Sequence, residues 1–255
     1  MSHIIKTQFA KFFDNIKLTK NQKKDARTKY TGVCKCLHDN YYTTEYSGST
    51  KLLIGSYGKK TNIRPARDID IIFKMPAEKF DQYDDNTSNK QSQLLNDIKC
   101  VLRQKYSDES TEIKADGKVV KISFTEGSHD VEVVPAWENE DGTFKIPDST
   151  DGGSWEDWDP RGEMKKISES EKKTKKTRML IKMVKKWSEI CKTSTKSYQI
   201  ENAVVEYFDS IDEYDVSYSE MVKEFFGYFT LSSIESHIET ANKRAKKQLY
   251  TKRKW

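Results

Sequence analysis

Apolar and aromatic residues recur at helical spacing from Ile4 to Ile16, and again from residue 20 to about Tyr42. Residues three or four apart lie on one face of a helix, so each stretch predicts an amphipathic helix. Between the two stretches, Thr19 and Gln22 have the spacing of a capping box, in which each side chain bonds a backbone amide at the start of the second helix. The sequence therefore opens with two predicted helices.

The spacing then changes to short runs that are typical of strands. Strands are predicted over residues 51–54, 68–73, 129–134 and 143–146, a hairpin over residues 112–124, and one helix over residues 88–106. The dipeptide Asp116-Gly117 favours a tight turn in the hairpin, and Pro135 is expected to end the strand that precedes it. These elements predict a mixed sheet with helices packed against it.

Residues from Asp159 onward show helical spacing alone. Asp159 suits a helix cap and Pro160 the first helical position. Helices are predicted around residues 179–187 and over residues 198–208, 221–229 and 234–250. We therefore expect an α+β chain, in which residues 1–158 form a mixed β-sheet core braced by an N-terminal helix. Residues 159–255 are expected to form a helical lobe, with an active-site cleft between the two.

Composition narrows the possible partners only slightly. Hydrophobic residues make up 35% of the 255 positions and charged residues 33%, with a formal net charge of +5. This charge favours anionic partners but does not distinguish nucleotides from nucleic acid. The basic C-terminal segment lacks a matching aromatic array, so nucleic acid is not expected as a partner.

Neither a membrane segment nor a metal-binding cysteine cluster is expected. No apolar stretch resembles a signal peptide or a membrane span, so a cytoplasmic location is expected. The cysteines Cys34 and Cys36 form one C-x-C pair without a second pair, which favours free thiols over zinc.

The pattern most indicative of chemistry is Gly55-Ser56, eleven further residues, and then Asp68-Ile-Asp70. A glycine-serine turn after a buried strand offers backbone amides and a hydroxyl to a triphosphate. Asp68 and Asp70 alternate on one strand, so both side chains leave the same face, where carboxylates suit Mg²⁺ or Mn²⁺. A D-x-D pair or a Gly-Ser turn alone is common by chance; their combination predicts a metal-dependent phosphoryl-transfer site.

A third carboxylate is expected from a neighbouring strand. The segment from His129 to Trp137 carries Asp130 and Glu132 on one face and continues into Val-Val-Pro-Ala. Glu132 is the expected ligand, and Asp130 remains the alternative.

Taken together, these motifs resemble the bacterial cGAS/DncV-like nucleotidyltransferases, which belong to the polymerase-β-like nucleotidyltransferase superfamily. The segments Met183–Trp187 and Lys196–Glu201 are also similar to that family. The resemblance implies that the sheet is a nucleotidyltransferase core, with Asp68, Asp70 and Glu132 as catalytic metal ligands. It further implies that the donor nucleotide is bound by Gly55, Ser56, Lys185 and Ser197, with Tyr198 stacked on its base.

The family resemblance also implies a function. Nucleoside triphosphates such as ATP and GTP would be condensed into a cyclic di- or oligonucleotide messenger, with two-metal catalysis and release of pyrophosphate. Such relatives act in bacterial antiphage signalling and pass the product to a separate effector protein. The alternatives are a tRNA-nucleotidyl or poly(A)-type polymerase, which needs a more basic RNA-binding lobe, and a catalytically inactive nucleotide-sensing module.

Overall fold

The computed structural model describes residues 3–85, 87–108, 111–127 and 129–229. Contacts divide the chain into two compact units. One unit comprises residues 18–164, and the other comprises the described residues up to Lys17 together with those from Lys165 onward. The sequence predicted a single boundary after residue 158, whereas this division groups the first helix with the C-terminal helices.

The first unit is built on a mixed β-sheet, as predicted. Its described strands are β1 (Lys51–Leu53), β2 (Ile69–Lys74), β3 (Glu112–Asp116), β4 (Val119–Ser123), β5 (Val131–Glu138), β6 (Phe144–Asp148) and β7 (Ser154–Trp158). The strand order is β1-β2-β5-β4-β3, with β6 paired to β5 and β7 paired to β6. β2 and β5 run parallel, and the other described pairs are antiparallel.

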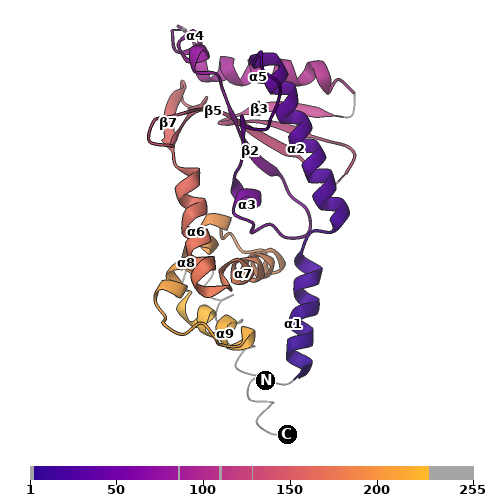
Figure 1. Cartoon of the computed structure of the whole chain (residues 1–255), viewed down its shortest axis with the longest axis vertical. Helices are drawn as coiled ribbons and strands as arrows, with labels where there is room; N and C mark the ends of the chain where they lie inside the picture. Colours follow the sequence, from indigo (N-terminus) through magenta and orange to yellow (C-terminus); the bar gives the residue numbers. More distant parts are fainter. Residues whose placement is uncertain (1–2, 86, 109–110, 128, 230–255) are drawn as a thin grey trace. The chain divides into compact units, whose positions relative to one another are not determined.

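Side-chain alternation along β2 and β5 gives the sheet two different faces. Ile69, Ile71 and Phe73 of β2 belong to the main core, together with residues of α2 (Lys20–Tyr41) and α5 (Lys90–Lys105). These two helices cover that face of the sheet (Figure 1). The intervening residues Asp70 and Ile72 point to the opposite face, which has a smaller apolar cluster and leaves room for a site.

Several local features of this unit differ from the sequence expectation. β5 continues through Pro135 to Glu138, because the residues of β5 paired with β4 end at Val133 and those paired with β6 begin at Trp137. The hairpin turn is Gly117-Lys118, one residue later than predicted, since Asp116 pairs with Val119. β7 and three short helical elements were not predicted: α3 (Gly55–Gly58), η1 (Ala77–Lys79) and α4 (Phe80–Asp84).

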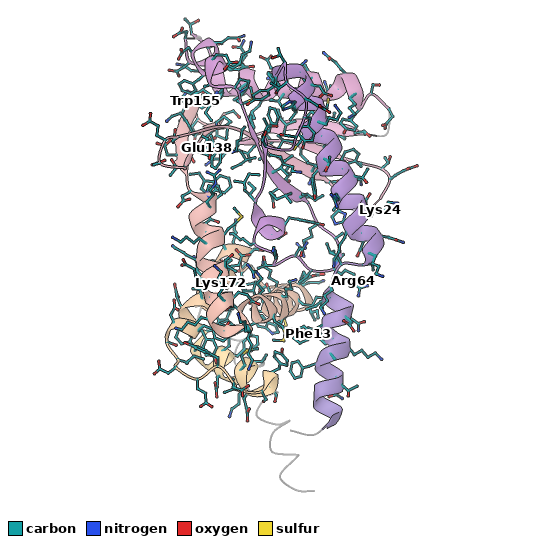
Figure 2. The ribbon with its side chains drawn as sticks, viewed as in Figure 1. Phe13, Lys24, Arg64, Glu138, Trp155 and Lys172 are labelled. Atoms are coloured by element: carbon teal, nitrogen blue, oxygen red, sulfur yellow. The ribbon has the colours of Figure 1, made fainter. Side chains whose placement is uncertain are left out.

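The second unit is helical. Its elements are α1 (His3–Ile16), the part of α6 (Pro160–Thr174) from Lys165 onward, α7 (Thr177–Cys191), α8 (Ser197–Asp209) and α9 (Tyr218–Tyr228). Phe13 and Ile16 of α1 are buried in one apolar cluster with residues of α7, α8 and α9. Phe13, labelled in Figure 2, meets the Tyr218 ring edge-on at 5.3 Å between centroids. This burial is why α1 groups with the C-terminal helices.

The predicted helix boundaries in both units are largely confirmed. The Thr19 capping box is present at α2, and the Asp159 carboxylate accepts the Gly162 amide at 2.7 Å at the start of α6. α6 and α7 are separated at Lys175, whose φ of 59° breaks the helical path. The helix predicted over residues 234–250 lies outside the described residues. Among the described helices, none is both long and apolar enough to cross a membrane.

Candidate active site

The carboxylates of Asp70 and Glu132 are brought together by the parallel pairing of β2 and β5. The two residues are direct Cα partners in this ladder. Paired strands lie about 4.8 Å apart, and partners in a ladder project from the same face. The predicted pairing of an acid from each strand is therefore observed, with Glu132 rather than Asp130 opposite Asp70.

Gly55 closes one side of this acid pair. Its φ is +53°, and a β-carbon added there would lie 2.0 Å from the Asp70 carboxylate oxygen Oδ2. Glycine is thus required both by the left-handed backbone and by the close approach of Asp70. The approach is fixed locally, because the Ile54 amide donates to the Asp70 carbonyl at 3.0 Å.

α3 begins at Gly55 and presents the start of a helical turn beside the acids. The amides at the beginning of a helix have no intrahelical acceptor, and here Ile54 offers no side-chain cap. Such amides suit phosphate oxygens. Ser56 lies in this turn, as predicted, but it does not line the pocket described next.

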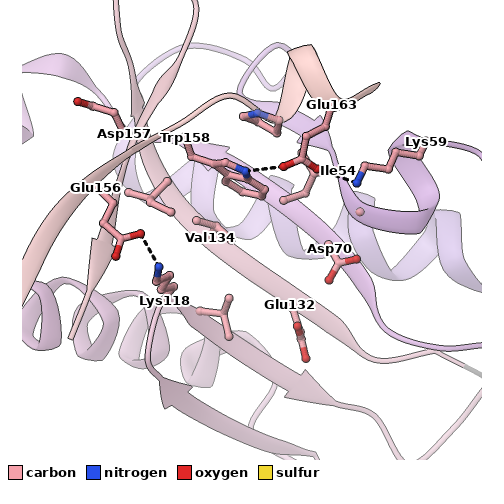
Figure 3. Close-up of a pocket in the computed structure, with 14 residues that line it drawn as sticks. Ile54, Lys59, Asp70, Lys118, Glu132, Val134, Glu156, Asp157, Trp158 and Glu163 are labelled. Carbon is pink, nitrogen blue, oxygen red and sulfur yellow. Dashed lines mark hydrogen bonds and ion pairs between the residues drawn. The ribbon is translucent and has the colours of Figure 1, made fainter. Parts of the chain in front are cut away.

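A pocket of about 450 Å³ opens on this face of the sheet (Figure 3). Its walls include Gly55, Lys59, Asp70, Glu132, Val134 and Trp158, all from the first unit. Figure 3 shows Asp70 below Lys59 and Glu132 lower in the view, with the ion pair of Lys118 and Glu156 on the other side of the pocket. The size falls within the usual range for small-ligand sites.

The carboxylate of Glu163 links two residues of the pocket wall, Lys59 and Trp158. One carboxylate oxygen accepts from Lys59 Nζ at 2.7 Å, and the other accepts from the Trp158 indole at 3.0 Å (Figure 3). The Lys59 side chain is almost buried. This pairing holds a cation near the Gly55 turn and orients the Trp158 ring at the pocket.

The acids carry more negative charge than their surroundings readily accommodate. Burial, followed by the charges of Glu132 and Asp68, raises the pKa of Asp70 to about 6. Burial and the charge of Asp68 also raise the pKa of Glu132. Clustered carboxylates of this kind favour either a proton or a cation.

Asp68 reaches this cluster through Lys121 of β4. Lys121 Nζ donates to Asp68 Oδ2 at 2.9 Å, and it lies 3.5 Å from Glu132 Oε1 and 3.6 Å from Asp130 Oδ2. Burial acts against the ammonium, but the hydrogen bond and charge of Asp68 outweigh it and raise the pKa of Lys121. Asp130 is separately engaged, because its Oδ1 accepts the Phe124 amide at 3.2 Å. Neither Asp68 nor Asp130 lines the pocket.

In their present positions the acids do not form a metal cage. Among the described residues, no three His, Cys, Asp or Glu side chains are arranged to hold a metal ion. The chemistry of the donors nevertheless fits a hard divalent cation, since they are all carboxylate oxygens and already hold a cation, the Lys121 ammonium. Asp68, Asp70 and Glu132 therefore remain the expected ligands for Mg²⁺ or Mn²⁺.

The three residues expected from the C-terminal helices belong to the second unit. Lys185 is buried and donates to Glu201 at 2.6 Å, so its charge is already shared with a carboxylate. Ser197 is exposed at the start of α8, and Tyr198 is 58% exposed. This exposure shows that the Tyr198 ring is not part of the core and is accessible for stacking.

A buried hydrogen-bonded chain supports the Gly55 turn from behind. The Tyr57 hydroxyl contacts His129 Nε2, and His129 Nδ1 lies 3.0 Å from Asp25 Oδ2. Lys29 of α2 also donates to the His129 carbonyl at 2.7 Å. These bonds join α2, α3 and the residues just before β5. Of these elements, α3 carries Gly55 and β5 carries Glu132.

Sequence reasoning did not single out Lys59, Lys118, Lys121 or Glu163 as residues of this site. Lys121 had a usable signal, since Val120 and Ile122 alternate with it as apolar residues and place it on the opposite face of β4. No comparable pattern marks Lys59 and Glu163, because their contact depends on how α3 and the start of α6 pack together.

The fold is that of the nucleotidyltransferases. The sequence model of the Second Messenger Oligonucleotide or Dinucleotide Synthetase (SMODS) domain matches residues 2–171, and the chain belongs to this family. The expected kinship with the cGAS/DncV-like nucleotidyltransferases is thereby confirmed.

Known relatives agree with this assignment. The chain is 26% identical over 221 residues to a probable cyclic nucleotide synthase of Bacillus cereus (strain VD146), covering 76% of this chain but only 66% of that protein. Its fold is similar to CdnC of E. coli MS115-1, solved with ATP (TM-score 0.65, 20% identity, covering 89% of this chain and 71% of that one). It is also similar to the Vibrio cholerae DncV cyclic AMP-GMP synthase, solved with the linear intermediate pppA(3′,5′)pG (TM-score 0.68, 12% identity, covering 92% and 86%).

Proposed function

We propose that this protein condenses nucleoside triphosphates into a cyclic di- or oligonucleotide and releases pyrophosphate. The observation that carries the proposal is the pairing of Asp70 with Glu132 at the wall of a nucleotide-sized pocket, directly beside the Gly55 turn. The names of the relatives support the same chemistry, since they include a cyclic nucleotide synthase and a cyclic AMP-GMP synthase.

Each element of the pocket has a part in this reaction. The first amides of α3 and the Ser56 hydroxyl bind the triphosphate, and the Lys59 ammonium offsets part of its charge. The apolar face of Trp158 and the Lys118–Glu156 pair suit a nucleobase, which needs a flat surface and hydrogen-bonding partners. From the second unit, Tyr198 stacks on the donor base, while Lys185 and Ser197 bind phosphate oxygens.

The carboxylates of Asp68, Asp70 and Glu132 hold the divalent cations. When bound, Mg²⁺ or Mn²⁺ lowers the pKa of the attacking hydroxyl and neutralises the leaving pyrophosphate. The hydroxyl oxygen of one nucleotide forms a bond to the α-phosphorus of another, and the bond from that phosphorus to pyrophosphate breaks. A second round of the same transfer closes the ring.

The biological setting follows from the product. A small cyclic nucleotide carries information only if another protein binds it, so we propose that a separate effector receives the product. The family resemblance makes bacterial antiphage signalling the proposed setting.

The test is to incubate the protein with all four nucleoside triphosphates and Mg²⁺ or Mn²⁺, and to analyse phosphatase-resistant products by mass. We expect a cyclic product from the wild type and none from the Asp68→Asn/Asp70→Asn double variant or from Glu132→Gln. Asp130→Asn should retain activity, because Glu132 and not Asp130 is the partner of Asp70, and Asp130 already accepts the Phe124 amide. Extension of an added RNA would instead indicate a polymerase, and triphosphate binding without any product would indicate a sensing module.

A further inference from the structure

Lys121 lies among the carboxylates of Asp68, Asp130 and Glu132 at the beginnings of β2 and β5. It is the Cα partner of Glu132 across the antiparallel β4–β5 pair. Its neighbours Val120 and Ile122 are fully buried on the helix-covered face, so Lys121 projects from the face that carries the acids. The sheet register itself therefore fixes this lysine beside Glu132.

Its ammonium is shared by three carboxylates. The separations are 2.9 Å from Asp68, 3.5 Å from Glu132 and 3.6 Å from Asp130. The Lys121 side chain is 34% exposed and that of Glu132 26%, so solvent screens these charges only in part. An ordinary surface ion pair engages one carboxylate, whereas here one ammonium is shared by three carboxylates and offsets part of their charge.

We propose that Lys121 is a built-in counter-cation, which occupies the place of a divalent cation between Asp68 and Glu132 until one binds. This proposal rests on the proposed function, because it assumes that these acids are the metal ligands. Lys121 is a positioning residue on this view, since it acts through the carboxylates and not on the substrate.

The physical reason is competition for the same oxygens. An ammonium and a divalent cation on the same carboxylate oxygens repel each other, so each weakens the binding of the other to Asp68 and Glu132. Lysine is suited to yielding its place, because its charge is compact and its four-carbon stem is flexible. In the cation-free protein the Lys121 ammonium reduces the repulsion between the carboxylates. When a divalent cation binds, the ammonium moves away from them.

Two consequences distinguish a counter-cation from a lysine that merely joins β4 to β5. Removing the charge should destabilise the cation-free protein and at the same time tighten cation binding. A purely structural lysine would lower stability equally with and without the cation. Lower stability without the cation and tighter binding of the cation are expected together only if Lys121 and the cation compete.

The experiment compares Lys121→Met with Lys114→Met in the full chain. Lys114 is the Cα partner of Lys121 on β3 and pairs with Glu112 at 2.7 Å, so its substitution removes the same charge from the same hairpin. Binding of Mn²⁺ is measured by calorimetry and by the rise in melting temperature as Mn²⁺ is added after EDTA treatment. We expect Lys121→Met to melt lower without the cation and to bind Mn²⁺ about tenfold more tightly than the wild type, with Lys114→Met unchanged.

A second variant retains the charge and so protects the test against a folding failure. Lys121→Arg should bind Mn²⁺ more weakly than the wild type, because the guanidinium grips carboxylates with two parallel hydrogen bonds. Equal or weaker Mn²⁺ binding by Lys121→Met, or unchanged binding by Lys121→Arg, overturns the proposal. If the wild type binds no Mn²⁺, or binds it as well after Asp70→Asn, the metal site in the proposed function fails and this inference fails with it.

Discussion

At the scale of single residues, Gly55 shows how closely the backbone approaches the reacting groups. Gly55 and Gly117 share almost the same left-handed conformation, with φ of +53° and +54°. A β-carbon at Gly55 would collide with the Asp70 carboxylate, whereas one at Gly117 would meet nothing within 4 Å. Comparing alanine substitutions at the two glycines therefore distinguishes the effect of backbone strain from the effect of displacing the Asp70 carboxylate.

We predict that Gly117→Ala costs only the strain of a left-handed alanine, about 1–2 kcal/mol, and leaves product formation nearly unchanged. Gly55→Ala carries the same strain and also displaces Asp70, so product formation should fall by roughly a hundredfold or more. Melting temperatures and initial rates of the two variants check this. Equal losses of activity would show that strain, and not the displacement of Asp70, limits the reaction.

A second prediction concerns Asp70 and pH. Its pKa is raised in the folded protein to about 6 by burial and by the neighbouring acids, above its ordinary value of 3.8. The folded state thus holds the proton more firmly than the unfolded state, and stability is lost as pH rises from about 4 through 6. In EDTA, Asp70→Asn should melt higher than the wild type at pH 7, by about 1–3 kcal/mol of unfolding free energy. The gain should shrink towards pH 4; a gain independent of pH would assign it to packing instead.

The sequence could predict the acids but not their counter-charges. Alternation within one strand places Asp68 and Asp70 on a common face, and the same rule places Asp130 with Glu132. The choice between Asp130 and Glu132 depends on the β2–β5 register, which pairs Asp70 with Glu132 and leaves Asp130 bonded to the Phe124 amide. Lys121 and Lys59 were missed because they meet the acids only through tertiary pairing.

At the scale of elements, the hydrogen-bonded chain of Tyr57, His129 and Asp25 links three segments behind the site. The His129 side chain is wholly buried, and one of its two bonds is to a carboxylate. Such a chain fixes the position of α3 relative to β5, and hence the Gly55 turn relative to Glu132.

We predict that His129→Phe, which removes both bonds but fills the space, lowers the free energy of unfolding by about 2–4 kcal/mol. Tyr57→Phe, which leaves the bond between His129 and Asp25 in place, should cost less. In a double-mutant cycle the two changes should be non-additive, because they share a bond. Denaturant unfolding of the three variants measures this, and strict additivity would mean that the chain does not act as one unit.

Elements with strong local signals were predicted well, and those that depend on neighbours were not. The capping box at Thr19 and the cap at Asp159 depend on nearby residues only, and both are present. β5 was expected to end at Pro135, yet it continues because it stays paired with β2 as far as Ala136, while its pairing with β4 ends at Val133. β7 has charged and aromatic residues without clear alternation, and its pairing with β6 defines it.

At the scale of the whole molecule, the residues proposed to bind the nucleotide are divided between the two units. The pocket and its acids lie in the first unit, and Tyr198 lies in the second. The grouping of α1 with the C-terminal helices could not be predicted from the sequence, because the pattern of its apolar residues does not indicate which element packs against them.

We predict that Tyr198→Ala weakens triphosphate binding by about 1–3 kcal/mol, the usual contribution of a base–aromatic stack. Its melting temperature should hardly change, because the side chain is 58% exposed and leaves no cavity. Tyr198→Phe should bind almost normally, since the ring face is retained. Calorimetric affinity for ATP and GTP and a melting curve on the same samples decide the matter, and unchanged affinity of Tyr198→Ala would remove the residue from the site.

The parallel pairing of β2 with β5 also has a consequence for the order of folding. The two strands are far apart in the chain, with α5 and the β3–β4 hairpin between them, so closing this pairing costs more chain entropy than forming the local hairpin. Asp70 consequently reaches Glu132 only when the chain between the two strands, which includes α5 and the β3–β4 hairpin, has been closed into a loop. The acids come together only when β2 pairs with β5, and the apolar core buried by the same pairing offsets their repulsion. A partly folded chain therefore lacks the cluster, and its capacity for cations appears together with the native sheet.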